Sequence, residues 1–206
     1  YVNDVLIYRP FLVRSGQQEG LSFINSDMVS SVLFSAGGFE SKYGDKMSSA
    51  LDIKYRKPTE FGGSVSASLL GANIMLKGDS KNHRFTHISG FRYKTTKYVL
   101  NSLETKGDYD PVFFDFQTYL TYNISQKLEI SFIGNIALNN YTFIPTTRET
   151  KFGTIDESYK LTMYFDGQEV DKFETYTGAL SLAYKVTDNL NLKLITSAYS
   201  TIESET

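Results

Sequence analysis

Cysteine and tryptophan are absent from this sequence of 206 residues, and histidine occurs only twice. Without cysteine, the chain forms no disulfide and offers no thiolate to a metal ion or a substrate. The 21 lysines and arginines nearly balance the 23 aspartates and glutamates, and the basic residues do not cluster. We therefore expect no nucleic-acid partner, because binding to phosphates needs a concentrated basic surface.

Long apolar runs are also missing. None approaches the roughly 18 residues that a membrane-spanning helix needs. A membrane-spanning strand needs only about 9–11 residues in which apolar and polar side chains alternate. Aromatic residues are abundant, with 15 tyrosines and 15 phenylalanines. No signal peptide opens the sequence, so an exported protein would carry its leader upstream of Tyr1.

The sequence contains no arrangement of side chains that is typical of an enzyme or a metal site. Gly38 and Gly44 are separated by five residues, a spacing that differs from the phosphate-binding loop, and no nucleophile–base signature is present. His83 and His87 would share one face of a strand, but the sequence offers no motif for further metal ligands. We predict no enzymatic activity, no catalytic residue, no metal and no cofactor.

One stretch, residues 37–58, separates two kinds of pattern. A short apolar strand at residues 32–34 precedes the two glycines at 37–38, where we expect positive φ or a close backbone approach. Gly44 and Asp45 predict a second reversal of the chain. Residues 50–55 then alternate as a short strand, which Pro58 ends.

Taken in order, these features resemble the end of the plug domain of TonB-dependent outer-membrane receptors. That family has an apolar strand, a glycine turn, a Tyr-Gly pair, small residues and a last strand with a basic-Pro exit toward the barrel. Residues 1–7 are similar to an earlier plug strand, and residues 27–29 resemble the segment that precedes the glycine turn. The matching plug-motif residues include Gly37, Gly38, Tyr43, Gly44, Ser48, Ser49, Arg56, Lys57 and Pro58.

The resemblance implies an all-β chain with a small α+β plug portion, as a fragment of a plugged antiparallel transmembrane β-barrel. Residues 1–58 would form the C-terminal part of the plug and residues 59–206 the first strands of the barrel. Asp45, Lys46 and Lys54 are candidates for polar contacts between plug and barrel.

The implied function is energy-coupled uptake of a scarce nutrient, such as an iron chelate, haem or cobalamin, across the outer membrane of a Gram-negative bacterium. The implied partners are outer-membrane lipid, the cargo (a small molecule or an oligomer), and a TonB-type inner-membrane protein. The last of these would bind a segment upstream of Tyr1.

From residue 61 onward, the alternation of apolar and polar residues predicts seven strands. The first two are residues 62–70 and 72–78, and the third is residues 83–100. In the fourth strand, Phe114 and Phe116 alternate with Asp115 and Gln117. Later strands repeat this pattern, with tight turns at residues 79–82, 125–127 and 187–189 and long connections at residues 101–111 and 145–172.

The connections alternate between short and long, as in bacterial barrels, where turns are short on the periplasmic side and loops are long outside. The exception is a tight outer connection near Gly71. Seven is an odd number, so the barrel would be incomplete within these residues. Aromatic residues near strand ends suit interfacial girdles; they are Tyr93, Tyr98, Tyr122, Tyr141, Phe143, Tyr176 and Tyr184.

A soluble sheet with one packed face produces the same alternation. The alternative interpretation is therefore a soluble β-rich module of the cell surface that binds a glycan or a protein. It predicts apolar faces that pack on each other and loops of similar length at both ends. The polar and aromatic stretch at residues 146–172 is either a ligand-contacting loop or a loop without such a role.

Overall fold

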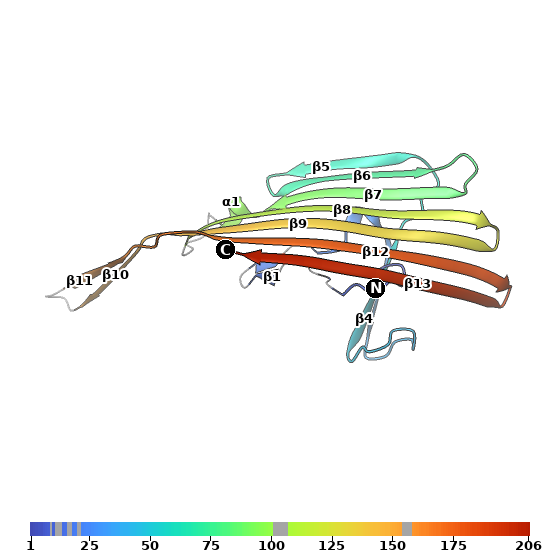
Figure 1. Ribbon diagram of the computed structural model, residues 1–206, viewed down its shortest axis with the longest axis horizontal. Helices are drawn as coiled ribbons and strands as arrows, with labels where there is room; N and C mark the ends of the chain where they lie inside the picture. Colours follow the sequence, from blue (N-terminus) through green and yellow to red (C-terminus); the bar gives the residue numbers. More distant parts are fainter. Residues whose placement is uncertain (9, 11–13, 16–17, 20–21, 101–106, 154–157) are drawn as a thin grey trace.

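The computed structural model describes residues 1–8, 10, 14–15, 18–19, 22–100, 107–153 and 158–206. These residues form an all-β fold built from antiparallel strands, as the alternation predicts. The N-terminal residues lie against one face of a large sheet (Figure 1). The predicted boundary after Pro58 falls between the last strand of this N-terminal unit, residues 1–58, and the first strand of the sheet.

The large sheet has seven strands in the order β13-β12-β9-β8-β7-β6-β5, so every strand pairs with its predecessor in the meander. Residues 59–206 also contain β10 (Arg148–Gly153) and β11 (Ser158–Met163), which pair with each other outside this sheet. Among the described strands, β5 and β13 each pair on one side only, and the sheet is not closed. The strands are β5 Gly62–Ser68, β6 Gly71–Asp79, β7 Phe85–Thr95, β8 Gly107–Ser125, β9 Leu128–Pro145, β12 Glu169–Thr187 and β13 Leu190–Glu205.

Several predicted strand ends are wrong. The third strand is shorter than residues 83–100, because it begins at Phe85 and a single helical turn, α1 (Lys97–Leu100), follows Thr95. His83 has a φ of +53° in the preceding turn, so it does not share a strand face with His87. Strand β8 begins at Gly107, within the predicted loop 101–111; residues 101–106 lie outside the described part of the chain.

The long connection between β9 and β12 contains a hairpin of its own. Strands β10 (Arg148–Gly153) and β11 (Ser158–Met163) pair antiparallel and extend beyond the end of the sheet (Figure 1). The rings of Phe152 and Tyr159 stack at 5.9 Å, and Lys160 forms an ion pair of 2.5 Å with Glu149. These cross-strand pairs order a segment that its polar composition predicts to be a loop.

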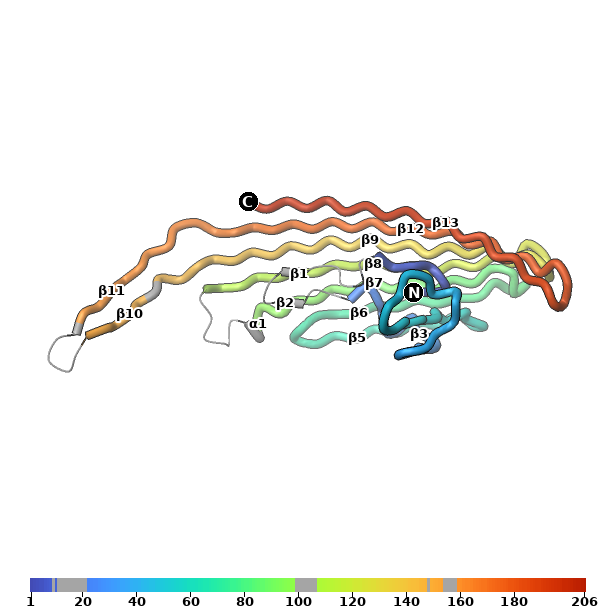
Figure 2. Tube along the Cα trace, turned by 90° about the horizontal axis from the view of Figure 1, so that it is seen from below, coloured from blue at the N-terminus to red at the C-terminus, as the bar shows by residue number. Residues whose placement is uncertain are grey.

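The N-terminal unit contains short pairings of its own. Strands β3 (Val29–Ala36) and β4 (Ser49–Tyr55) form an antiparallel pair, Val2 forms a parallel bridge with Ile53, and β1 (Arg14–Ser15) pairs with β2 (Gln18–Glu19). The chain path of this unit runs alongside the sheet strands in Figure 2. Among the described residues of 1–58, the only helical element is the 3₁₀ turn η1 (Ser26–Met28), so an α+β plug portion is not seen there.

Alternation along the strands gives the sheet two contrasting faces. We call the face that carries the N-terminal unit the inner face and the opposite one the outer face. In β8, every second residue from Gly107 to Thr121 is buried, and the set includes Asp115, Gln117 and Thr121. The residues between them are more exposed, and in the middle of the strand they are mostly apolar, such as Phe114 and Phe116. The covered face is therefore the polar one.

The same inversion is seen in the central strands, whereas the edge strands β5 and β13 are largely exposed on both faces. Cross-strand partners face the same side, so the register identifies each face. Exposed apolar residues of the outer face are Val65, Ile74, Leu76, Phe85, Phe91, Phe114, Phe116, Tyr122, Phe132, Ile136, Leu138, Tyr176, Leu180, Tyr184, Leu192 and Leu194. Buried polar residues of the inner face include Asp115, Gln117, Thr121, Asn135, Asn139, Asp171, Thr175 and Ser181.

A small apolar core joins the N-terminal unit to the inner face. Phe23, Met28 and Tyr55 contribute from the N-terminal unit, and Ile88 and Tyr119 contribute from the sheet. The rings of Tyr55 and Tyr119 meet edge to face at 6.2 Å. Packing of this core determines which residues of the two parts lie close enough to form hydrogen bonds and ion pairs with each other.

Candidate functional site

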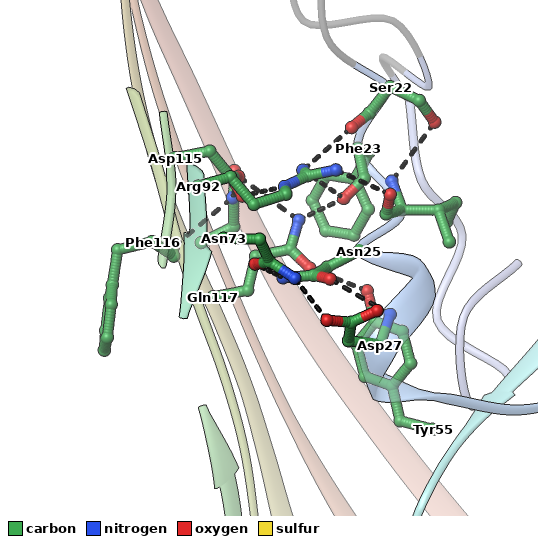
Figure 3. Close-up of polar contacts among 12 residues, drawn as sticks. Ser22, Phe23, Asn25, Asp27, Tyr55, Asn73, Arg92, Asp115, Phe116 and Gln117 are labelled. Carbon is green, nitrogen blue, oxygen red and sulfur yellow. Dashed lines mark hydrogen bonds and ion pairs between the residues drawn. The ribbon is translucent and has the colours of Figure 1, made fainter. Parts of the chain in front are cut away.

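The main polar contact between the two parts is made by the guanidinium of Arg92 on β7. Its Nη1 donates to the carbonyl of Ile24 (2.7 Å), and its Nη2 donates to those of Ser22 (2.9 Å) and Phe23 (3.3 Å). Figure 3 shows the guanidinium pointing from the sheet toward this loop. Because the acceptors are backbone atoms, the contact of Arg92 depends on the backbone conformation of residues 22–24 and not on their side chains.

Asp115, the cross-strand partner of Arg92 on β8, holds the guanidinium in place. Arg92 Nε donates to Asp115 Oδ1 at 2.8 Å, and the exposed fractions of the two side chains are 12% and 0%. The other carboxylate oxygen accepts from the amides of Gln117 (3.2 Å) and Asn135. A buried ion pair of this kind stabilises a structure only when additional donors satisfy it, as they do here.

Gln117 connects the same cluster to two segments of the N-terminal unit. Its amide donates to the carbonyl of Phe23, and its oxygen accepts from the Tyr55 hydroxyl at 2.8 Å. Burial raises the pKa of the Tyr55 hydroxyl above its ordinary range, so the group stays protonated and remains a donor. Tyr55 ends β4, and Phe23 lies before η1, so one sheet residue joins two segments of the unit (Figure 3).

A second contact lies beside the first, around the 3₁₀ turn. Asn73 of β6 donates to the carboxylate of Asp27 and accepts from Asn25 at 3.4 Å. The Asn25 side chain in turn accepts from the backbone of Asp27 as the N-cap of the turn. At Gly90, an added Cβ would lie inside van der Waals distance of Asn25 Nδ2, so this glycine permits the close approach.

Two ion pairs connect the parts at the short-turn end of the sheet. Asp4 accepts from Lys193 of β13 and from Lys54 of β4. Burial by itself raises the pKa of Asp4, but the hydrogen bonds from Lys193 and Lys54 outweigh this effect, so the pKa lies below its ordinary value. Lys57 binds both oxygens of Glu129 at 2.6 and 2.7 Å, where the chain leaves β4 for the sheet.

The predicted plug-motif residues lie within the N-terminal unit. Gly37 has a φ of +83°, as its place after an apolar strand predicts, whereas the residue with positive φ in the second reversal is Asp45 (+59°) rather than Gly44. Tyr43 is buried and donates to Asp52 at 2.8 Å. The motif residues Gly38 and Arg56 are exposed, and Arg56 donates to the carbonyl of Val29 at 2.8 Å. These contacts shape the unit itself.

The three residues predicted to connect the two parts differ in their surroundings. Lys54 reaches the sheet through Asp4, which it shares with Lys193. The ammonium of Lys46 lies 5.6 Å from the ring centre of Tyr1, and Asp45 is exposed. The structure therefore does not bring the three together at one contact.

The residues that make the principal contact, Arg92, Gln117 and Asn73, are not singled out by the sequence analysis. A usable signal exists for the first two, because polar residues recur on one side of strands whose other side is mostly apolar. Two predicted girdle residues, Tyr141 and Phe143, belong to the inner face instead, where their rings lie 6.1 and 4.8 Å from that of Tyr109.

No family model, curated protein or solved structure matches this chain. Within the described residues, no helix is long and apolar enough to cross a membrane. The described part of the chain also has no group of three or more His, Cys, Asp or Glu residues placed to hold a metal ion. In the described residues, buried hydrogen bonds hold the N-terminal unit against the polar inner face of the sheet.

Proposed function

We propose that this chain is part of a TonB-dependent outer-membrane receptor, in which residues 1–58 belong to the plug and residues 59–206 to the barrel wall. The observation that carries the proposal is the inverted polarity of the sheet. Its polar face is covered by protein, and its apolar face is exposed. In water, an exposed apolar surface of this extent is unfavourable, whereas lipid is its natural solvent.

The position of the N-terminal unit supports the same proposal. A plug must fill the lumen through polar contacts that can be broken without melting the wall. Arg92, Gln117 and Asn73 supply such contacts, and the strands that carry them keep their own ladder of hydrogen bonds. The unequal connections at the two ends of the sheet also follow the barrel pattern.

The soluble alternative requires a second apolar layer over the outer face, and the described residues do not supply one. The proposed activity is uptake of a nutrient, driven by an inner-membrane protein and without catalysed chemistry. The contacts of Asp4 with Lys193 and of Lys57 with Glu129 then connect movement of the plug to the wall.

A charge on the outer face tests the membrane assignment. Arginine in place of Leu180 should reduce the free energy of unfolding in lipid vesicles by about 2–4 kcal/mol. The soluble alternative places Leu180 under a second apolar layer, so it is separated from the membrane assignment by where the unaltered protein is recovered. Recovery of the protein in the soluble fraction, without detergent, would refute the proposal.

Uptake is tested in cells. Cells that contain the intact protein should deplete a nutrient from defined medium faster than cells that lack it. A protonophore should abolish the difference, because the proposed transport depends on inner-membrane energy. Depletion that is insensitive to the protonophore would contradict energy coupling.

A further inference from the structure

The N-terminal unit engages the two halves of the inner face differently. On β6–β8, the polar side chains Asn73, Arg92 and Gln117 have partners in the unit. Thr121 in the same half shares a hydrogen bond of 2.6 Å with Thr86. In the half formed by β9 and β12, which we call the β9–β12 wall, the described polar contact with the unit is the ion pair of Lys57 with Glu129 at the short-turn end.

Four oxygen atoms of the β9–β12 wall are buried and, within the described part of the chain, lack a hydrogen-bond partner. They are Asn135 Oδ1, Asn139 Oδ1, Asp171 Oδ1 and Thr175 Oγ1. The amide nitrogens of the two asparagines are already used, on Asp115 and on the carbonyl of Phe173 (3.5 Å). The unused capacity on this wall is therefore almost entirely that of acceptors.

The register arranges these four oxygens in a row. Asn139 lies opposite Phe173, which Asp171 and Thr175 flank, and Asn135 lies opposite Thr177. Same-face neighbours along a strand are about 7 Å apart, so the row extends about 20 Å along the strands. One ion cannot contact all four, whereas water or a solute moving along the row can contact each in turn. Buried acceptors without donors cost several kcal/mol, so donors from such species are expected there.

The outer end of this row is acidic. Asp171 pairs with Glu205 of β13, and Glu169 precedes Asp171 by two residues in β12, so all three carboxylates belong to the inner face. Lys172, the basic residue next to Asp171, belongs to the outer face by the same alternation. A positively charged solute is favoured at this end, and an anionic one is disfavoured.

We propose that the β9–β12 wall lines a hydrated route between the N-terminal unit and the sheet, and that this route takes cationic solutes rich in hydrogen-bond donors. The inference rests on the proposed function, because it places the cargo path of that function along one wall and assigns the charge of the cargo.

Single cysteines in the intact protein test the route, because the chain itself contains no cysteine. Thr175→Cys and Thr121→Cys form a matched pair: both threonines face inward, with exposed fractions of 1% and 2%, and they differ in hydrogen bonding. We expect a cationic methanethiosulfonate to modify Thr175→Cys about tenfold faster than Thr121→Cys in membranes, because water reaches only the former. Equal rates would overturn the proposal.

The charge of the reagent tests the cargo class. At Thr175→Cys, the cationic reagent should react faster than an anionic one, relative to their rates with a free thiol. Asp171 lies two same-face positions, about 14 Å, from Thr175. Adding Asp171→Asn should therefore slow the cationic reagent by about threefold, which is the effect of one carboxylate at that distance in a hydrated site. An anionic reagent that reacts as fast as the cationic one would overturn the assignment of a cationic solute.

A third cysteine separates this inference from the proposed function. Leu180→Cys lies on the outer face, and lipid should protect it from both reagents in membranes but not in denaturant. Rapid modification of Leu180→Cys in membranes would refute the membrane assignment itself. Protection at Leu180→Cys with equal rates at Thr175→Cys and Thr121→Cys would refute the route alone.

Discussion

Replacing Arg92 with methionine should release residues 22–24 from the sheet while leaving the sheet folded. The substitution keeps an unbranched apolar stem and removes three charge-assisted hydrogen bonds to backbone carbonyls. At about 1 kcal/mol each, these bonds contribute about 3 kcal/mol to the closed state. Since about 1.4 kcal/mol corresponds to a factor of ten, local opening should become about 150-fold more frequent.

Hydrogen exchange measures this opening. The amides of Phe23 and Met28, which donate to Pro10 (2.8 Å) and Asn25 (3.1 Å), report on the released segment. Amides of β12 serve as the internal reference. Arg92→Lys is the matched control: it keeps a positive charge beside Asp115 but lacks the fork that reaches several carbonyls, so its effect should be intermediate.

Two outcomes would refute this reasoning. If Arg92→Met changes exchange at Phe23 and Met28 by less than about threefold, the carbonyl contacts do not hold the segment. If the amides of β12 accelerate as much as those of the segment, the loss is global. Loss of the ion pair then matters more than loss of the carbonyl contacts, because an unpaired buried Asp115 destabilises the sheet.

Three further perturbations test other contacts. Gly90→Ala should destabilise the contact between the N-terminal unit and the sheet by about 1–3 kcal/mol, because the added Cβ overlaps Asn25. Gly178→Ala is the control: its Cβ meets only a ring atom at 3.9 Å, so it should have little effect. Denaturant unfolding measures the stability of both variants. Because the folded-state pKa of Asp4 is lowered, its contribution should be complete above its ordinary pKa of 3.8 and lost as the pH falls through the lower folded-state value. Asp4→Asn should therefore speed exchange of the Asn3 amide about two- to fivefold near neutral pH and have no effect in strong acid, and a pH-independent ratio would contradict this. Glu129→Gln should cost less than about 1 kcal/mol, since its ion pair with Lys57 is partly exposed, and a larger loss of stability in the same unfolding assay would show a structural role.

The sequence by itself determined the strands and the two faces of the sheet. Alternation with a period of two fixes which side chains share a face, so the opposition of Phe116 to Gln117 could be predicted without coordinates. Local turn chemistry fixed the reversal at Gly37 and the short turns of the meander. The strand ends around His83 and Gly107 were predicted wrongly, because pairing with a neighbouring strand extends or ends a strand irrespective of local composition.

Only the tertiary structure decided which face the N-terminal unit covers. Alternation is the same for a soluble sheet and for a barrel wall, because it does not say what covers either face. The contact of Arg92 joins residues about 70 positions apart and ends on backbone carbonyls, which have no sequence signature. The unpaired oxygens of Asn139 and Thr175 are likewise visible only in three dimensions, because hydrogen-bond satisfaction depends on what folding brings opposite each atom.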